Sequence, residues 1–165
     1  MIRKTTMTGM IAAIYVVLTF VSSSFGFGAI QFRISEMLCL LPFLYPYTGV
    51  GVILGCLISN MLMSPFALDW VMGTAASLIA VFLTSKSKNV YLAAFWPVVV
   101  NGFFVSLLIT FLSGGGNAGL YAFYINFATV AVGEAVVCYL LGIPLVKLFE
   151  KSVPLQNAML GRNRK

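Results

Sequence analysis

Long apolar stretches separated by short polar or proline-bearing breaks dominate the chain. Six such stretches cover residues 6–21, 35–45, 48–63, 68–84, 90–112 and 120–149, and 35–45 is short for a span. The second and third stretches stop before Pro46 and Pro65, and helices usually end at the residue before a proline. A membrane-spanning helix needs about 20 mostly apolar residues, so this chain holds at most about six spans. We therefore predict an all-α integral membrane bundle of six transmembrane helices.

The composition points to lipid as the solvent. Hydrophobic residues make up 61% of the chain and charged residues 8%, which leaves too little polar surface to cover a soluble globule. We expect residues 1–151 to form one transmembrane domain and residues 152–165 to form a loose, polar, basic tail. A separate nucleotide-hydrolysing domain does not fit, and the chain has no G-x-x-x-x-G-K-[ST] motif. Any ATP-driven work must therefore come from partner proteins.

The basic residues predict the orientation of the bundle. With six spans, every lysine and arginine except Arg33 lies on one face: Arg3, Lys4, Lys86, Lys88, Lys147, Lys151, Arg162, Arg164 and Lys165. Loops rich in lysine and arginine stay in the cytoplasm, so both termini are expected there. Five spans would put Lys86 and Lys88 opposite one of the basic termini, which makes six the better count.

The residue types argue against metal and redox chemistry. Cys39, Cys56 and Cys138 all lie in apolar stretches without C-x-x-C spacing, and histidine is absent. We expect no metal and no cofactor. A small membrane enzyme, such as a lipid-modifying one, would need a nucleophile with a base or an acidic metal-binding cluster, and the scattered acids do not provide one. A structural bundle or channel subunit stays open as a further alternative.

Glu134 is the strongest candidate for a functional residue, because a charged side chain within a bilayer costs about 3 kcal/mol or more. Asn126 precedes it by eight residues and lies about 80° away around the same helix. Two interpretations are open: Glu134 contacts a ligand, or it is a structural carboxyl that is protonated or paired to another helix. Asn101, in the middle of residues 90–112, either joins helices or binds a ligand edge.

A second group of polar and aromatic residues lies at the predicted outer ends of the spans: Gln31, Arg33, Glu36, Asn60, Asp69 and Trp70. Arg33 and Glu36, three residues apart, form either a local ion pair or ligand contacts. Trp70 is either an interfacial aromatic residue or a ring that stacks on a ligand. At the opposite end of the chain's first span, Gly9 and Ala13 are four apart and form a small-residue face that lets another helix approach closely.

Three segments give the chain a resemblance to a known family. They are IQFRISE (residues 30–36), GCLISN (55–60) and DWVMGT (69–74). Together with the surrounding residues, from about 5 to 150, they resemble the QueT family, the queuosine-precursor S components of energy-coupling-factor (ECF) transporters. The resemblance implies a six-helix membrane subunit that binds its substrate from outside. It also implies partners: a membrane scaffold subunit and two cytoplasmic ATPase subunits. In this family an A-x-x-x-A pattern on the first helix docks on the scaffold, and the matching place here reads Gly9-x-x-x-Ala13.

The implied substrate is a 7-deazaguanine, such as 7-cyano- or 7-aminomethyl-7-deazaguanine, or the free base queuine. A guanine-like edge offers two neighbouring N–H donors to a carboxylate, its carbonyl accepts from an amide, and its ring stacks on an aromatic side chain. Glu134, Asn101 and Trp70 supply these groups. An aminomethyl cation would need a second acid, either Glu36 or Asp69. An S component for another flat heterocyclic vitamin, such as a flavin or a pterin, is the alternative within the same class.

Overall fold

The computed structural model describes residues 2–23, 32–112 and 119–160, and all regular elements within these ranges are helical. The elements are α1 (Ile2–Val21), the 3₁₀ helix η1 (Ile34–Leu40), α3 (Leu41–Leu44), α4 (Thr48–Met63), α5 (Ala67–Ser85), α6 (Val90–Leu112), α7 (Gly119–Ala135), the π-helix η2 (Val136–Gly142), α8 (Ile143–Lys151) and α9 (Val153–Leu160). The prediction of an all-α chain is confirmed for the described residues.

Four helical stretches are long and apolar enough to cross a membrane: Ile2–Val21, Ala67–Ser85, Val90–Leu112 and Gly119–Lys151. Two shorter apolar helical stretches cover Ile34–Leu44 and Thr48–Met63. Large apolar side chains on several helices face outward, and Phe20, Leu62 and Phe111 are each 68–72% exposed. Such surfaces require lipid rather than water. The chain is a multi-pass membrane protein, while the count of six spans stays a prediction.

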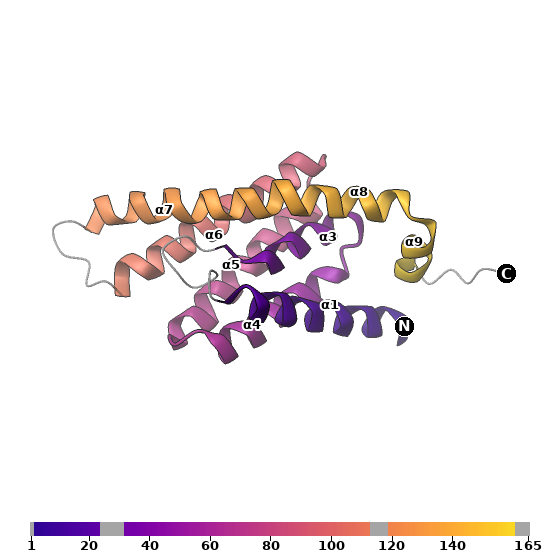
Figure 1. Cartoon of the computed structure of the whole chain (residues 1–165), viewed down its shortest axis with the longest axis horizontal. Helices are drawn as coiled ribbons and strands as arrows, with labels where there is room; N and C mark the ends of the chain where they lie inside the picture. Colours follow the sequence, from indigo (N-terminus) through magenta and orange to yellow (C-terminus); the bar gives the residue numbers. More distant parts are fainter. Residues whose placement is uncertain (1, 24–31, 113–118, 161–165) are drawn as a thin grey trace.

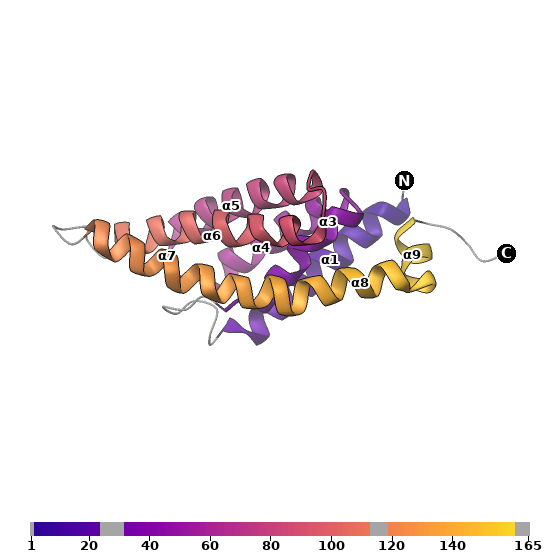
Figure 2. The ribbon, with the colours of Figure 1, turned by 90° about the horizontal axis from the view of Figure 1, so that it is seen from above.

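The long helices run along the long axis of the molecule. The beginning of α1 lies at the same end of the molecule as α9 (Figure 1). Neighbours in space form a chain of pairs in which α1 packs on α4, α4 on α5, α5 on α6, and α6 on α7. Figure 2 shows the continuous stretch of α7, η2 and α8 lying along α6. The short helices η1 and α3 lie inside this arrangement, because η1 contacts both α1 and η2.

Glycines of α4 set its close approach to α1. A Cβ added at Gly51 would lie 2.5 Å from the carbonyl oxygen of Thr8, and one added at Gly55 would lie 2.6 Å from Cβ of Tyr15. Only glycine fits at such distances, so Gly51-x-x-x-Gly55 forms the tight helix contact. Gly9, in contrast, has nothing within 4 Å of an added Cβ and is exposed. The small-residue face of α1 therefore points away from α4.

The last long helical stretch widens into a π-helix just after Glu134. Pro144 has no backbone N–H, so the usual bond to a carbonyl four residues back is absent there. One residue earlier, the N–H of Ile143 bonds to the carbonyl of Cys138, five residues back, which is the hydrogen-bond spacing of a π-helix. This widened segment, η2, packs against η1. Two irregular helices, η1 and η2, thus meet within the bundle. Irregular π-helical segments are often found at functional sites.

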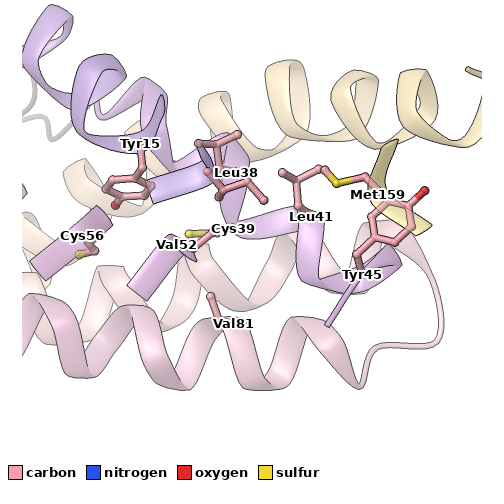
Figure 3. Packing of buried hydrophobic residues seen from close by; sticks show 10 residues of the cluster. Tyr15, Leu38, Cys39, Leu41, Tyr45, Val52, Cys56, Val81 and Met159 are labelled. Carbon is pink, nitrogen blue, oxygen red and sulfur yellow. The ribbon is translucent and has the colours of Figure 1, made fainter. Parts of the chain in front are cut away.

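A buried apolar cluster joins α1, η1, α3, α4, α5 and α9; the residues labelled in Figure 3 are Tyr15, Leu38, Cys39, Leu41, Tyr45, Val52, Cys56, Val81 and Met159. Met159 belongs to α9 and is 7% exposed, and the Tyr47 hydroxyl donates a 2.9 Å hydrogen bond to its carbonyl oxygen. The expectation of a loose tail is therefore wrong for Val153–Leu160, because an apolar side chain and a backbone carbonyl attach this segment to the core.

Candidate functional site

Arg33, Asn60 and Asp69 meet in one buried polar cluster, each from a different segment. Nη1 of Arg33 donates to Oδ1 of Asn60 at 3.2 Å, and Nη2 of Arg33 lies 3.5 Å from Oδ2 of Asp69. Nδ2 of Asn60 donates to the carbonyl oxygen of Asp69 at 3.3 Å. All three residues are at most 5% exposed. The cluster fixes the segment before η1 against the end of α4 and the beginning of α5.

Gly73 leaves the room that this cluster occupies. An added Cβ at Gly73 would lie 2.7 Å from Nδ2 of Asn60 and 3.0 Å from Oδ1 of Asp69. Contacts below 3.0 Å are essentially never tolerated by a real Cβ, so a side chain here forces Asn60 to move. Gly73, in the DWVMGT segment, therefore has a steric function beside this cluster.

Glu36 is also buried, but its hydrogen bonds go to α1 and η1 rather than to this cluster. It is 1% exposed, Oε1 accepts a 2.6 Å hydrogen bond from the Tyr15 hydroxyl, and Oε2 accepts a 2.8 Å hydrogen bond from the Cys39 thiol. Arg33 makes its ion pair with Asp69. The interpretation of a local Arg33–Glu36 ion pair is therefore wrong for the described side chains, because the guanidinium is directed to α4 and α5 while the carboxylate is directed to α1.

Glu134 and Asn101 form the second buried acid site. Nδ2 of Asn101 donates to Oε1 of Glu134 at 3.3 Å, and the two residues are 4% and 3% exposed. The Cys138 thiol lies 4.0 Å from Oε2 of Glu134 and 4.0 Å from the backbone carbonyl oxygen of Glu36. A sulfur contact of that length is weak. Oε2 of Glu134 can therefore accept a hydrogen bond from a stronger donor. The Cys138 thiol lies between Glu134 and the backbone of Glu36.

Two polar atoms on α5 are buried without a hydrogen-bond partner among the described residues: Nε1 of Trp70 and Oγ1 of Thr74. They are one helical turn apart and so lie on the same side of the helix. A buried unpaired polar group costs about 1–3 kcal/mol. A ligand that offered an acceptor to the indole N–H would remove part of that cost. Ser59 Oγ, on α4, is a third such atom.

Two predicted site residues do not join these clusters. Nδ2 of Asn126 donates to Oγ1 of Thr110 at 3.2 Å, which joins the middle of α7 to the last turn of α6. Gln31 lies outside the described residues. Within the described ranges, no group of three or more histidine, cysteine and acidic side chains is placed to hold a metal ion.

Several polar contacts of the site could not be assigned from the sequence. Tyr15, Cys39 and Cys138 lie in apolar stretches and carry no charge, yet each bonds or approaches a buried glutamate. The one signal available was the hydroxyl of Tyr15 in the middle of a membrane span, where an unpaired hydroxyl is costly. Cys39 and Cys138 gave no such signal, because a buried thiol behaves as a small apolar group and needs no hydrogen-bond partner.

Two surface cavities lie away from the acidic residues. One, of about 320 Å³, is lined only by apolar side chains of α1, η1, α3, α8 and α9. The other is an open groove of about 580 Å³ between α6 and the η2–α8 segment, with two lysines among its residues. The buried acids instead bond to neighbouring side chains. A small polar molecule binding among them would exchange these bonds for its own.

Comparison with known proteins gives two matches. The model of the QueT transporter family matches residues 5–151, which run from the first turn of α1 to the end of α8 and include all of the polar clusters above. The chain is also similar to the queuosine precursor transporter QueT of Lactococcus lactis subsp. cremoris (strain MG1363), with 31% identity across 75% of this chain and 79% of that protein. No solved structure matches the chain.

Proposed function

The chain belongs to the QueT transporter family, and from this we propose that it is the membrane-embedded substrate-binding (S) subunit of an ECF-type importer for a queuosine precursor. The proposed substrate is 7-cyano-7-deazaguanine, 7-aminomethyl-7-deazaguanine or queuine. The curated relative is named as a queuosine precursor transporter. The observation that carries the assignment to a site is the buried Glu134–Asn101 pair, an acceptor and an amide held 3.3 Å apart on facing helices.

The chemistry of this pair suits the edge of a deazaguanine. A carboxylate accepts two neighbouring N–H donors at once, and charge-assisted bonds are about twice as strong as neutral ones. Glu134 would accept from the edge, while the amide of Asn101 turns to the carbonyl oxygen of the substrate. The indole N–H of Trp70 and the hydroxyl of Thr74 supply two further polar groups that have no partner among the described residues.

Glu36 is the better of the two candidates for binding an aminomethyl cation. Asp69 is already paired with Arg33 at 3.5 Å. Among its described contacts, Glu36 accepts hydrogen bonds only from the neutral groups of Tyr15 and Cys39, and it makes no ion pair with a described residue. A substrate ammonium group would supply an ion-pair partner. Arg33 and Asn60 would form the outer wall of the same site, and Gln31 stays a proposed substrate contact.

The proposal includes the arrangement in the membrane and the partners. Residues 1–151 would form the substrate-binding domain with six spans and both termini in the cytoplasm. The exposed face at Gly9 and Ala13 would dock on a membrane scaffold subunit that carries two cytoplasmic ATPase subunits. The support for this is steric, because an added Cβ at Gly9 meets nothing within 4 Å and the face does not pack on α4.

Calorimetric titration of the purified protein with a panel of ligands tests the proposal. The panel contains the three deazaguanines, guanine, a flavin and a pterin. We expect one-to-one binding of at least one deazaguanine and no heat from the flavin or the pterin. Binding of a flavin or pterin alone would assign the chain to another vitamin, and no binding of any ligand by folded protein would support a structural bundle.

A further inference from the structure

The open groove beside α8 combines positive charge with an apolar wall. It lies between the beginning of α6 and the η2–α8 segment, which run side by side (Figure 2). Its volume is about 580 Å³, and it is lined by Tyr91, Tyr139, Ile143, Pro144, Lys147, Leu148 and Lys151. None of these residues belongs to the polar clusters around Glu36 and Glu134, so the transport site does not account for the groove.

Both lysines of the groove are available to an external anion. Lys147 and Lys151 are one helical turn apart on α8 and both are exposed. No ion pair joins either lysine to a carboxylate among the described residues. Glu150, the acid of α8, does not line the groove. The beginning of α6 adds backbone N–H groups with partial positive charge, although Asn89 already caps one of them at 2.7 Å.

The rest of the groove is apolar and lies where the membrane-spanning stretch Gly119–Lys151 ends. Ile143 and Pro144 form its wall, and Leu148 is 57% exposed beside the lysines. The hydroxyl of Tyr139 donates to the carbonyl oxygen of Tyr91 at 3.1 Å, which holds two aromatic side chains at the rim. Tyrosines are enriched at the level of lipid headgroups, and lysines near helix ends extend to the same level.

We propose that this groove is a binding site for an anionic phospholipid. The phosphate group would lie between Lys147 and Lys151, and an acyl chain would run along the apolar wall. Basic pockets between membrane helices bind anionic headgroups in this way. A free inorganic anion has no apolar group to bury against the wall, and a zwitterionic lipid would place its cationic headgroup next to two lysines. The two properties of the groove together therefore favour an anionic lipid.

Native mass spectrometry of the full-length, delipidated protein in detergent tests the proposal. Phosphatidylglycerol and phosphatidylcholine with the same acyl chains are titrated separately. We expect the parent to bind phosphatidylglycerol about tenfold more tightly, and K147Q with K151Q to lose that preference. K147R with K151R should keep it, because both charges remain. The matched control is R3Q with K4Q, which removes two charges at the beginning of α1 and should also keep the preference.

Four outcomes would overturn the proposal. Equal binding of the two lipids by the parent would exclude an anionic-lipid site. If R3Q with K4Q lost the preference for phosphatidylglycerol as completely as K147Q with K151Q, the preference would come from net charge alone. Displacement of phosphatidylglycerol by millimolar inorganic phosphate would make the groove a free-anion site. A glutamine variant of Lys147 and Lys151 that keeps lipid selectivity but fails to assemble with partner subunits would assign the groove to a protein contact.

Discussion

Replacing Gly73 with alanine should disturb the Arg33–Asn60–Asp69 cluster while leaving the rest of the fold in place. The added Cβ would lie 2.7 Å from Nδ2 of Asn60, and ordinary contact begins at 3.4 Å, so the amide must retreat by 3.4 − 2.7 = 0.7 Å. Its hydrogen bond to the carbonyl oxygen of Asp69 is already 3.3 Å long and would break. The bond from Arg33 to Oδ1 of Asn60, at 3.2 Å, belongs to the same amide group and would be strained.

The free-energy cost of these lost hydrogen bonds is partly offset by the higher helix propensity of alanine. A neutral hydrogen bond contributes about 1 kcal/mol and one with a charged partner about 1.5–3 kcal/mol. Alanine in place of glycine within a helix returns roughly 0.5–1 kcal/mol. The balance for Gly73→Ala is therefore a loss of about 1–3 kcal/mol. If Asn60 and Arg33 contact the substrate, a displaced amide should weaken binding about tenfold, which corresponds to about 1.4 kcal/mol.

Thermal unfolding and calorimetric titration of the purified variant measure both effects. Gly9→Ala is the matched control, because an added Cβ there meets nothing within 4 Å and only the propensity gain remains. We expect Gly73→Ala to melt at a lower temperature and to bind deazaguanine about tenfold more weakly, with Gly9→Ala equal to the parent in affinity. If Gly73→Ala kept the parent's affinity and stability, the cluster would be neither tightly packed nor part of the site.

Three further predictions concern docking, orientation and the indole. Gly9→Leu combined with Ala13→Leu should abolish uptake by the assembled transporter and spare substrate binding, because the bulk meets a partner helix; equal loss of both activities would place this face inside the fold. A membrane-impermeant thiol reagent added to intact cells should label Gly28→Cys and not Lys86→Cys, against a background of three buried native cysteines; labelling at position 86 from outside would refute six spans with cytoplasmic termini. Trp70→Phe should weaken deazaguanine binding by about tenfold without lowering the melting temperature of ligand-free protein, since it removes a buried N–H that lacks a described partner; unchanged affinity would make Trp70 an interfacial aromatic residue.

The sequence predicted where the helices lie along the chain better than how they face one another. Val90–Leu112 and Thr48–Met63 agree with the predicted ranges, because polar or proline-bearing breaks end each apolar run. The contact between α1 and α4 was not predicted. In a helix that is apolar on every side, hydrophobic periodicity does not indicate which face packs inward. Gly51 and Gly55 determine that face through close backbone approach, which only the neighbouring helix reveals.

The polar residues were identified correctly as unusual, but their partners depend on long-range packing. The meeting of Arg33 with Asn60 and Asp69 joins residues 27 and 36 positions apart. The contact of Glu36 with Tyr15 depends on where η1 enters the bundle, and the approach of Cys138 to the carbonyl of Glu36 depends on how η2 packs against η1. These are properties of tertiary structure, so the sequence alone gave the residue types without the pairs.

The central claim is that Glu134 accepts hydrogen bonds from the edge of a deazaguanine. Glu134→Gln keeps the shape of the side chain and replaces one acceptor with a donor, which leaves a substrate N–H unpaired. We expect a loss of roughly 2 kcal/mol, or about 30-fold in Kd, by calorimetric titration beside the parent. Glu150→Gln, the same change at an exposed position, is the control and should bind as the parent does. Unchanged affinity in a folded Glu134→Gln protein would contradict the account and return Glu134 to a structural role.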